Sequence, residues 1–365
     1  PSSYVYALEL SPDERWIATG DWDGCVRLWD RESGVLIASR VVAQGADLHV
    51  ESLSWSPDGR RLAAMAWNGR GSAHVVVFDL ATGRVLSQQP ESNALTMRAV
   101  CVLDGERYLT ANRKGLGLYS LESGAQLGAR IEPPVAMPDD MWSLRWRARR
   151  SFDGERVAVG FVNGWVGVYR CSDLAPLATW KAHGAAVHDV AWSRDGALLA
   201  TASADRSAAV FEAATGERRS TLVGHASGVF SAAFSNAGER IFTASDDRTL
   251  RVWETRTGRE LAQLVGHEDY VFGVECGRDD SVVSCSGDGT LRLWDERTRS
   301  QLLAAQRERA ALVEKLAPRV ESEVQGGGCA AAYERLLKAS DLTERERTVA
   351  LQLVVARGFA SDGQR

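Results

Sequence analysis

Residues 201–225 read TASADRSAAVFEAATGERRSTLVGH and residues 243–267 read TASDDRTLRVWETRTGRELAQLVGH, so one phrase is written twice, 42 residues apart. The part of this phrase that varies least is a short apolar run that ends in an aromatic residue, and this run recurs along the chain. The copies are VRLWD (26–30), VVVFD (75–79), GLGLY (115–119), VGVYR (166–170), AAVFE (208–212), LRVWE (250–254) and LRLWD (291–295). Repetition with a period of roughly 20–50 residues is typical of solenoids and propellers, so these copies decide the fold.

Each repeat unit is built from short apolar runs separated by turn residues. One unit contains VFSAAF (229–234), ERIFTAS (239–245), TLRVW (249–253) and ELAQLV (260–265). Runs of this length are too short for ordinary helices and favour β-strands, so each unit is predicted to be a sheet of four short antiparallel strands. A lone sheet of this size buries little surface. Closing the repeats into a ring covers both faces of every sheet and leaves only short edges.

The units resemble WD40 repeats. The Trp-Asp pair of that family appears as Trp29-Asp30 and Trp294-Asp295, and its Gly-His pair as Gly224-His225 and Gly266-His267. The resemblance implies an all-β fold, a seven-bladed β-propeller of four-stranded antiparallel blades within residues 1–305, followed by a short α-helical extension over residues 306–365. The blades are expected at about 4–47, 48–92, 94–134, 138–182, 184–223, 226–265 and 268–305. The motifs are clear in blades one, five, six and seven, whereas blades two to four depend on spacing.

The resemblance also implies that a hydrogen-bonded set of His, Ser or Thr, Asp and Trp braces each well-preserved blade. Carried over position by position, the sets are His225, Thr243, Asp247 and Trp253 in blade six, His267, Ser284, Asp288 and Trp294 in blade seven, and His183, Thr201 and Asp205 in blade five, where Phe211 replaces the tryptophan. Blade one has Thr19, Asp23 and Trp29 without a histidine. His, Ser and Asp also form catalytic triads, but a catalytic site has no reason to recur at blade spacing. These sets are therefore interpreted as structural.

Composition limits the kinds of function that this chain can have. It has 365 residues, a net charge of −5 and an isoelectric point near 5.8, which argues against a general binder of nucleic acid. The longest apolar runs fall short of the ~18 residues of a membrane-spanning helix. The six cysteines show no CxxC pairing and are expected to be buried free thiols in a reducing compartment, the cytoplasm. No metal site, nucleotide-binding loop or other cofactor site is predicted.

In the WD40 family, the loops before the inner strands and between the second and third strands form the usual docking face for proteins and peptides. Aligning the units places the following candidate partner-binding residues on this top face: Tyr4, Tyr6, Trp22, Trp142, His188, Phe230, Tyr270 and Phe272. Blades seven and one are neighbours in a closed ring, so Tyr270, Phe272, Tyr4, Tyr6 and Trp22 are expected to form one aromatic cluster of the kind found at binding hot spots. The alternative is that the channel-facing members only pack against one another.

The predicted function is a non-catalytic protein-protein interaction platform or scaffold whose partner is a protein or peptide. Two alternatives stay open. The first is an anion-binding module built on the locally basic stretch RWRARRSFDGER (145–156), through Arg145, Arg147, Arg149 and Arg150. The second is an enzyme or small-ligand site in the central channel, where the alignment places Glu51, Arg98, Asp140 and His188.

After Asp295 the sequence becomes rich in helix-forming residues. A first helix is expected to be interrupted at Pro318 and at the glycines 326–328, and a last helix to begin with a capping box of Thr343 and Glu346 and to stop at Gly358. This tail resembles helical ends of bacterial multidomain WD40 proteins, some of which carry a Ser/Thr protein kinase upstream, and the likeness implies a part of a larger signalling protein. It is expected to pack on the last blade or on the underside of the ring. The outer strand of blade seven is expected from SQLLAA (300–305) or from residues upstream of Pro1.

Overall fold

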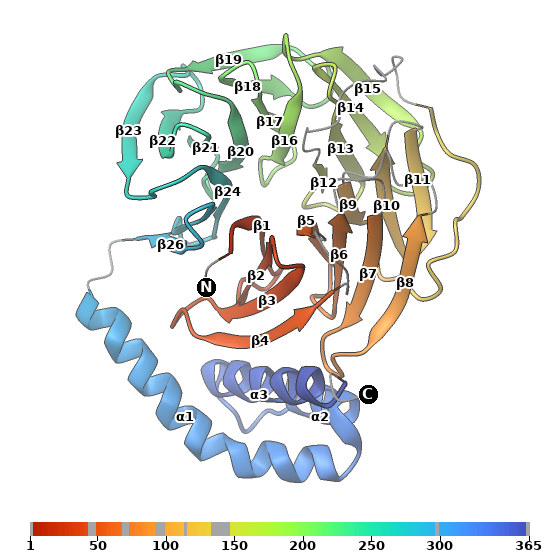
Figure 1. Ribbon diagram of the computed structural model, residues 1–365, viewed down its shortest axis with the longest axis vertical. Coiled ribbons are helices and arrows are strands. Elements are labelled where there is room, and N and C mark those ends of the chain that lie inside the picture. Colours follow the sequence, from red (N-terminus) through yellow and green to blue (C-terminus); the bar gives the residue numbers. More distant parts are fainter. Residues whose placement is uncertain are drawn as a thin grey trace.

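The computed structural model describes residues 3–42, 49–67, 73–91, 99–112, 115–132, 147–295 and 299–362. In this part of the chain, seven antiparallel sheets are arranged as blades around a common axis, and three helices follow them (Figure 1). The predicted seven-bladed β-propeller with a helical C-terminal extension is therefore confirmed. The inner strands of successive blades contact one another around the axis, and the first strand contacts blade seven, which closes the ring.

Within the blades, the strands follow one another as antiparallel meanders from the axis outwards. Blades one to three comprise β1 (Val5–Leu10), β2 (Trp16–Asp21), β3 (Cys25–Asp30) and β4 (Leu36–Val41); β5 (His49–Trp55), β6 (Arg61–Trp67), β7 (Ala73–Asp79) and β8 (Val85–Glu91); and β9 (Ala99–Val102), β10 (Arg107–Asn112) and β11 (Gly115–Ser120). Blades four and five comprise β12 (Ala148–Arg150), β13 (Arg156–Gly160), β14 (Trp165–Arg170) and β15 (Pro176–Lys181); and β16 (Val187–Trp192), β17 (Leu198–Ser203), β18 (Ser207–Glu212) and β19 (Arg218–Val223). Blades six and seven comprise β20 (Val229–Phe234), β21 (Arg240–Ser245), β22 (Thr249–Glu254) and β23 (Glu260–Val265); and β24 (Val271–Cys276), β25 (Val282–Ser286) and β26 (Leu291–Trp294).

Two of the blades have three strands among the described residues, where four were expected. In blade three, the place of a fourth strand is taken by isolated bridges that join Tyr119 to Gln126 and Leu116 to Ile131. In blade seven, residues 299–305 do not form the expected outer strand, because the helix α1 (Arg299–Gln325) already begins there. The Ala- and Leu-rich stretch follows its helix propensity, so the first helix of the tail begins before residue 306.

The hydrophobic core lies between the blades. Between blades five and six, for example, Ala200 and Val210 pack with Val229, Ile241 and Trp253 in one buried cluster. Strand residues alternate between the two faces of each sheet, so every blade contributes apolar side chains to both of its neighbours. Packing of this kind makes each blade depend on the next one.

The ring is closed between blade seven and blade one by the same kind of packing. Phe272 and Val283 of blade seven are buried against Val5 and Leu8 of blade one. On the underside of this junction, where the turns after the inner strands lie, Arg31 of blade one donates a hydrogen bond of 2.6 Å to Ser281 of blade seven. Side-chain packing and polar contacts therefore hold this junction together.

The C-terminal extension consists of α1, α2 (Gly328–Leu337) and α3 (Glu344–Asp362), and it packs on blades one and two, with α3 beside the outer strand β4 (Figure 1). Leu336, Val354 and Phe359 are buried in one hydrophobic cluster with residues of these two blades. The ion pair between Arg60 and Glu334, at 2.9 Å, ties the tail to an underside turn of blade two. The tail thus packs against the outer edge of blades one and two and reaches their underside turns, whereas the last blade or the underside of the ring was expected.

The helix ends differ partly from the prediction. The capping box forms, because the Glu346 amide donates to Thr343 Oγ1 at 3.2 Å and the Thr343 amide donates to Glu346 Oε2 at 2.9 Å. Pro318, however, lies inside α1, which continues because Leu316 and Val320 on either side of it are buried. A proline costs a helix one hydrogen bond, and tertiary packing offsets that loss here.

Gly358 also lies inside α3 and does not end it. Its backbone rests on the turn of blade two, so that a β-carbon at Gly83 would lie 2.5 Å from the carbonyl carbon of Gly358. Gly83 has a φ of +68°, a left-handed conformation that glycine adopts without steric cost. The two glycines therefore permit the close approach of the tail to the propeller.

Candidate functional site

Blade six contains a complete hydrogen-bonded set of the four predicted side chains. Trp253 Nε1 donates to Thr243 Oγ1 at 2.8 Å, and Thr243 Oγ1 lies 2.7 Å from His225 Nε2. The other ring nitrogen, His225 Nδ1, lies 2.8 Å from Asp247 Oδ2. Each polar group thus satisfies the next one, which links the top loop, β21 and β22 in one chain of contacts.

Blades seven and five repeat the arrangement. In blade seven, Trp294 Nε1 donates to Ser284 Oγ at 2.9 Å, and His267 lies between Ser284 and Asp288 at 2.7 and 2.8 Å. In blade five, His183 lies between Thr201 and Asp205 at 2.7 and 2.9 Å, while the apolar Phe211 takes the tryptophan position. In blade one, Trp29 Nε1 donates to Thr19 Oγ1 at 2.9 Å, but Asp23 is exposed.

These hydrogen bonds shift the titration of the polar groups. Burial opposes ionisation of Asp288, but hydrogen bonds from Thr290, from the Glu268 amide and from His267 outweigh it and lower the pKa of this carboxyl to about 2. Burial also lowers the pKa of His267, against the opposing effect of Asp288. The set is thus most stable with a neutral imidazole that donates to a carboxylate.

The hydroxyl groups in these sets are not placed for nucleophilic catalysis. Thr243, Ser284 and Thr201 are fully buried between strands, whereas a nucleophile must face its substrate. The structural interpretation of the sets agrees with this burial.

The top face of the ring carries a second kind of feature, at the second or third residue of the inner strands. In blades one, two, five, six and seven, the pairing register of the inner strand shifts at this residue, which marks β-bulges at Tyr6, Glu51, His188, Phe230 and Phe272. A β-bulge redirects the side chain of the extra residue. The bulges therefore explain why the same position of several blades contributes side chains to the region around the axis.

Three exposed aromatic side chains, which we call the aromatic patch, lie where blades seven and one meet: Tyr4, Trp22 and Tyr270 are each 43–44% exposed. The Tyr4 and Trp22 rings meet edge to face with centroids 6.2 Å apart. The backbone holds them in place, because the Trp22 amide donates to the Tyr4 carbonyl at 2.9 Å and the Gly287 amide donates to the Tyr270 carbonyl at 2.9 Å. Exposed aromatic side chains held rigidly in this way are suited to docking a partner.

Less exposed rings, which we call the inner aromatic row, support the patch from the side of the axis. The row consists of Tyr6, Phe272, Phe230 and His188. Tyr6 stacks on Phe272 with centroids 4.6 Å apart, and Phe272 meets Tyr270 edge to face at 6.1 Å. Phe272 and His188 are buried, so these two members act as support for the exposed rings.

The structure thus brings together all five residues of the predicted blade-seven and blade-one cluster, and it joins Phe230 and His188 to them through the row. Trp142, the remaining candidate, lies outside the described residues. Sequence reasoning omitted two contributors, His49 and Trp67. The His49 ring stacks on Trp22 with centroids 4.6 Å apart, and Trp67 meets His49 edge to face at 5.4 Å. The alignment of the units places His49 at the top-face position of Tyr4, but it does not indicate the contact between His49 and Trp22.

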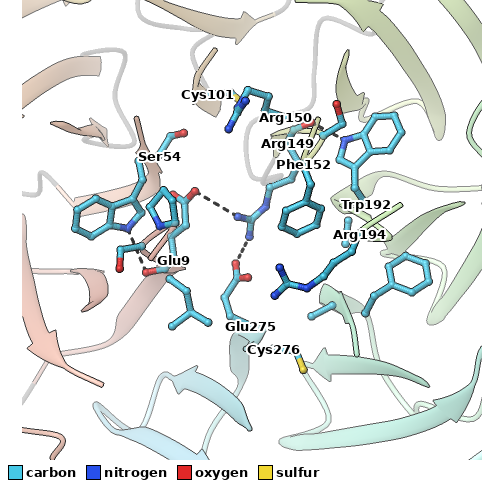
Figure 2. A pocket seen from close by; sticks show the side chains of 18 of the residues that line it. Glu9, Ser54, Cys101, Arg149, Arg150, Phe152, Trp192, Arg194, Glu275 and Cys276 are labelled. Carbon is cyan, nitrogen blue, oxygen red and sulfur yellow. Dashed lines mark hydrogen bonds and ion pairs between the residues drawn. The ribbon is translucent and has the colours of Figure 1, made fainter. Parts of the chain in front are cut away.

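The opposite mouth of the channel, on the underside, contains a cavity of about 400 Å³ lined by charged side chains (Figure 2). Arg149 lies between Glu9, at 3.6 Å, and Glu275, and it also faces Asp189 at 3.8 Å. Burial raises the pKa of Glu9 to about 8, although Arg149 opposes this shift. Arg147 is close to Asp189 and Glu275 as well.

The predicted anion site is therefore not supported at Arg147 and Arg149, because carboxylates already neutralise both guanidinium groups. Arg145 and two of the predicted channel residues, Arg98 and Asp140, lie outside the described residues. Glu51 lies beside the patch and not at the underside, since His49 Nε2 is 3.1 Å from Glu51 Oε1.

Other chemistry-bearing groups are inert or dispersed. All six cysteines are free, and burial raises the pKa of Cys101 and of Cys171 to about 12, which keeps them as thiols. Across the described ranges, no group of three or more His, Cys, Asp and Glu side chains is arranged to hold a metal ion. None of the helices in these ranges is both long and apolar enough to cross a membrane.

Comparison with known proteins agrees with the repeat assignment. The family described as "WD domain, G-beta repeat" matches residues 1–30, 174–212, 216–254 and 258–295. These stretches carry the third strands of blades one, five, six and seven, the blades in which the sequence motifs are clear.

Curated relatives align with parts of the chain. Coronin-7 of Mus musculus is 30% identical over 148 residues, which is 37% of this chain and 15% of that protein. Actin-interacting protein 1 of Drosophila melanogaster is 25% identical over 214 residues, which is 56% of this chain and 33% of that protein. WD repeat-containing protein 1 of Gallus gallus is 35% identical over 219 residues, which is 57% of this chain and 33% of that protein. The chain thus spans no more than a third of these relatives. The chain therefore contains WD40 repeats, four of them matched by the family, within a closed seven-bladed β-propeller that is followed by a helical C-terminal tail.

Proposed function

We propose that this protein is a non-catalytic platform that binds a protein or peptide partner on the top face of the propeller. The observation that carries the proposal is the aromatic patch. Tyr4, Trp22 and Tyr270 are large, exposed and supported by neighbouring rings, and side chains of these types dominate binding energy at protein interfaces. A rigid aromatic surface also loses little conformational entropy when a partner covers it.

Further observations support this role. The polar sets of blades five to seven are buried and brace the sheets, so the most reactive residue types of the chain serve its stability. One of the relatives, Actin-interacting protein 1, is named for an interaction with another protein. We further propose that the propeller acts as the scaffold of a larger signalling protein in the cytoplasm, where free thiols such as those of this chain stay reduced.

The experiment that tests the proposal compares partners captured by the wild type with those captured by the double variant Trp22→Ala and Tyr270→Ala. Each truncation of a hot-spot aromatic costs about 2 kcal/mol, so the double variant is expected to bind its partner several hundred-fold more weakly. Both side chains are 43–44% exposed, so the variant should unfold at the temperature of the wild type.

The matched control is Phe152→Ala. Phe152 is 58% exposed and lines the underside cavity, so its removal takes away an even more exposed aromatic side chain from the opposite face. A protein retained by the wild type and by Phe152→Ala but lost by the double variant supports docking on the top face. An identical set of retained proteins for all three chains refutes it.

A further inference from the structure

The charges around the aromatic patch have one sign. The described loop residues of blades seven and one on the top face include Asp23, Glu268 and Asp269, and they include no lysine or arginine. Within the described part of the chain, no ion pair joins any of these three carboxylates to a basic side chain. A partner that covers the patch therefore meets uncompensated negative charge.

Asp269 is held in a defined position beside the patch. Its Oδ1 accepts a hydrogen bond of 2.8 Å from the Tyr270 amide, and Ser286 Oγ donates to its backbone carbonyl at 3.1 Å. Its Oδ2 lies over Gly287, because a β-carbon at Gly287 would be 2.9 Å from this oxygen and 2.9 Å from Tyr4 Cδ1. The missing side chain at Gly287 thus lets the Asp269 carboxylate and the Tyr4 ring approach each other closely over the glycine backbone.

Other aspartates on the same face are engaged in contacts of their own. Asp288 and Asp247 accept hydrogen bonds in the structural sets of blades seven and six. Asp246 accepts a hydrogen bond from Ser227 Oγ. Compared with these aspartates, Asp269 is the carboxylate that is both fixed in place and directed towards the exposed rings.

A carboxylate next to an aromatic ring suits one class of side chain. A cation is attracted to the face of a tyrosine or tryptophan ring, and more strongly when a carboxylate completes its hydrogen bonds. The planar guanidinium group of arginine can stack on a ring and donate to a carboxylate at the same time, whereas the ammonium group of lysine is a strongly hydrated point charge. An acidic side chain would be repelled by all three carboxylates.

We propose that the aromatic patch recognises an arginine-bearing extended peptide, whose guanidinium group donates hydrogen bonds to the Asp269 carboxylate and stacks on the exposed ring of Tyr4 beside it. The inference rests on the protein-docking role proposed above and specifies the chemistry of the partner. Asp23 and Glu268 provide the surrounding negative potential that draws a basic segment to this face.

The test uses the full chain and three fluorescently labelled nonapeptides that are identical except at every third position, which is arginine, lysine or glutamate. Fluorescence anisotropy at low and high salt measures binding. The arginine peptide is expected to bind most tightly and the glutamate peptide most weakly, and high salt should weaken the arginine peptide. Asp269→Asn is expected to weaken the arginine peptide about tenfold, because it removes a charge-assisted hydrogen bond and keeps the shape of the side chain.

Gly287→Ala provides a second variant, because its β-carbon would lie 2.9 Å from both Asp269 Oδ2 and Tyr4 Cδ1 and would force the two side chains apart. It should therefore weaken binding of the arginine peptide. Glu239→Gln is the matched control, since Glu239 is an exposed carboxylate in an underside turn of blade six, and this variant should bind all three peptides like the wild type. The inference is overturned if the arginine and glutamate peptides bind equally, if Asp269→Asn matches the wild type, or if no arginine peptide binds at millimolar concentration.

Failure of this inference and failure of the docking role are distinguishable. A captured partner that depends on Trp22 and Tyr270, but not on Asp269 or on salt, refutes the arginine specificity and leaves the docking role in place. A partner that is indifferent to Trp22 and Tyr270 refutes the docking role itself.

Discussion

Replacing Trp253 by alanine removes the largest fully buried side chain among the described residues. The indole packs between blades five and six and donates the 2.8 Å hydrogen bond to Thr243 on which the polar set of blade six depends. Truncation of a buried tryptophan costs about 3–5 kcal/mol, and the hydrogen bond adds about 1 kcal/mol. Trp253→Ala is therefore expected to lower the free energy of unfolding by about 4–6 kcal/mol, which urea denaturation followed by circular dichroism measures.

The control comes from the chain itself, because blade five has Phe211 at the equivalent position and still keeps its His183, Thr201 and Asp205 contacts. Trp253→Phe should retain most of the packing, because it removes only the N–H donor and the five-membered ring of the indole. It is expected to lower the free energy of unfolding by about 1–2 kcal/mol. A Trp253→Ala variant with an unchanged urea midpoint, or one no less stable than Trp253→Phe, would refute the structural role assigned to this set.

Two further predictions concern the tail and the effect of pH. Gly83→Ala is expected to displace the tail, because the new β-carbon would clash with the backbone of Gly358, and limited proteolysis should then cleave α3. The control is Gly34→Ala at the equivalent turn of blade one. Gly34 has the same φ of +68° but no atom within 4 Å of its β-carbon position, so this variant should keep the tail protected. Equal cleavage of the two variants would show that the close contact does not hold the tail. Between pH 7 and 4.5 the raised pKa of Glu9 and the lowered pKa of His267 change stability in opposite directions. Below pH 4 the urea midpoint is expected to fall, because Asp288 loses its contribution between about pH 4 and its folded pKa of about 2. Asp288→Asn should flatten this dependence below pH 4, and a midpoint that rises on acidification over this range would contradict the assigned protonation states.

The number of blades and the polar sets could be predicted from local patterns. The aromatic residues that end the third strands recur from Trp29 to Trp294 every 41–50 residues, and a repeat that cannot bury its own faces has few ways to pack. Within one blade, the spacing from His225 to Trp253 is enough to bring the set together, because the partners lie on adjacent strands joined by short turns. Closure of a ring also brings the aromatic residues of blades seven and one to one place.

Other features depend on contacts between segments that are far apart in the sequence. Nothing local indicates that His49 stacks on Trp22, that Arg149 lies between Glu9 and Glu275, or that Asp269 and Tyr4 meet above Gly287. The sequence of residues 299–305 is compatible with a strand and with a helix. Pro318 and Gly358 predicted helix breaks, but tertiary packing keeps both residues inside continuous helices. The sequence by itself thus determined the repeat, the strands and the sets that brace them, since these follow from period and spacing. Only the tertiary structure decided where the tail docks and which charges remain unpaired beside the aromatic patch, because those outcomes depend on which distant surfaces meet.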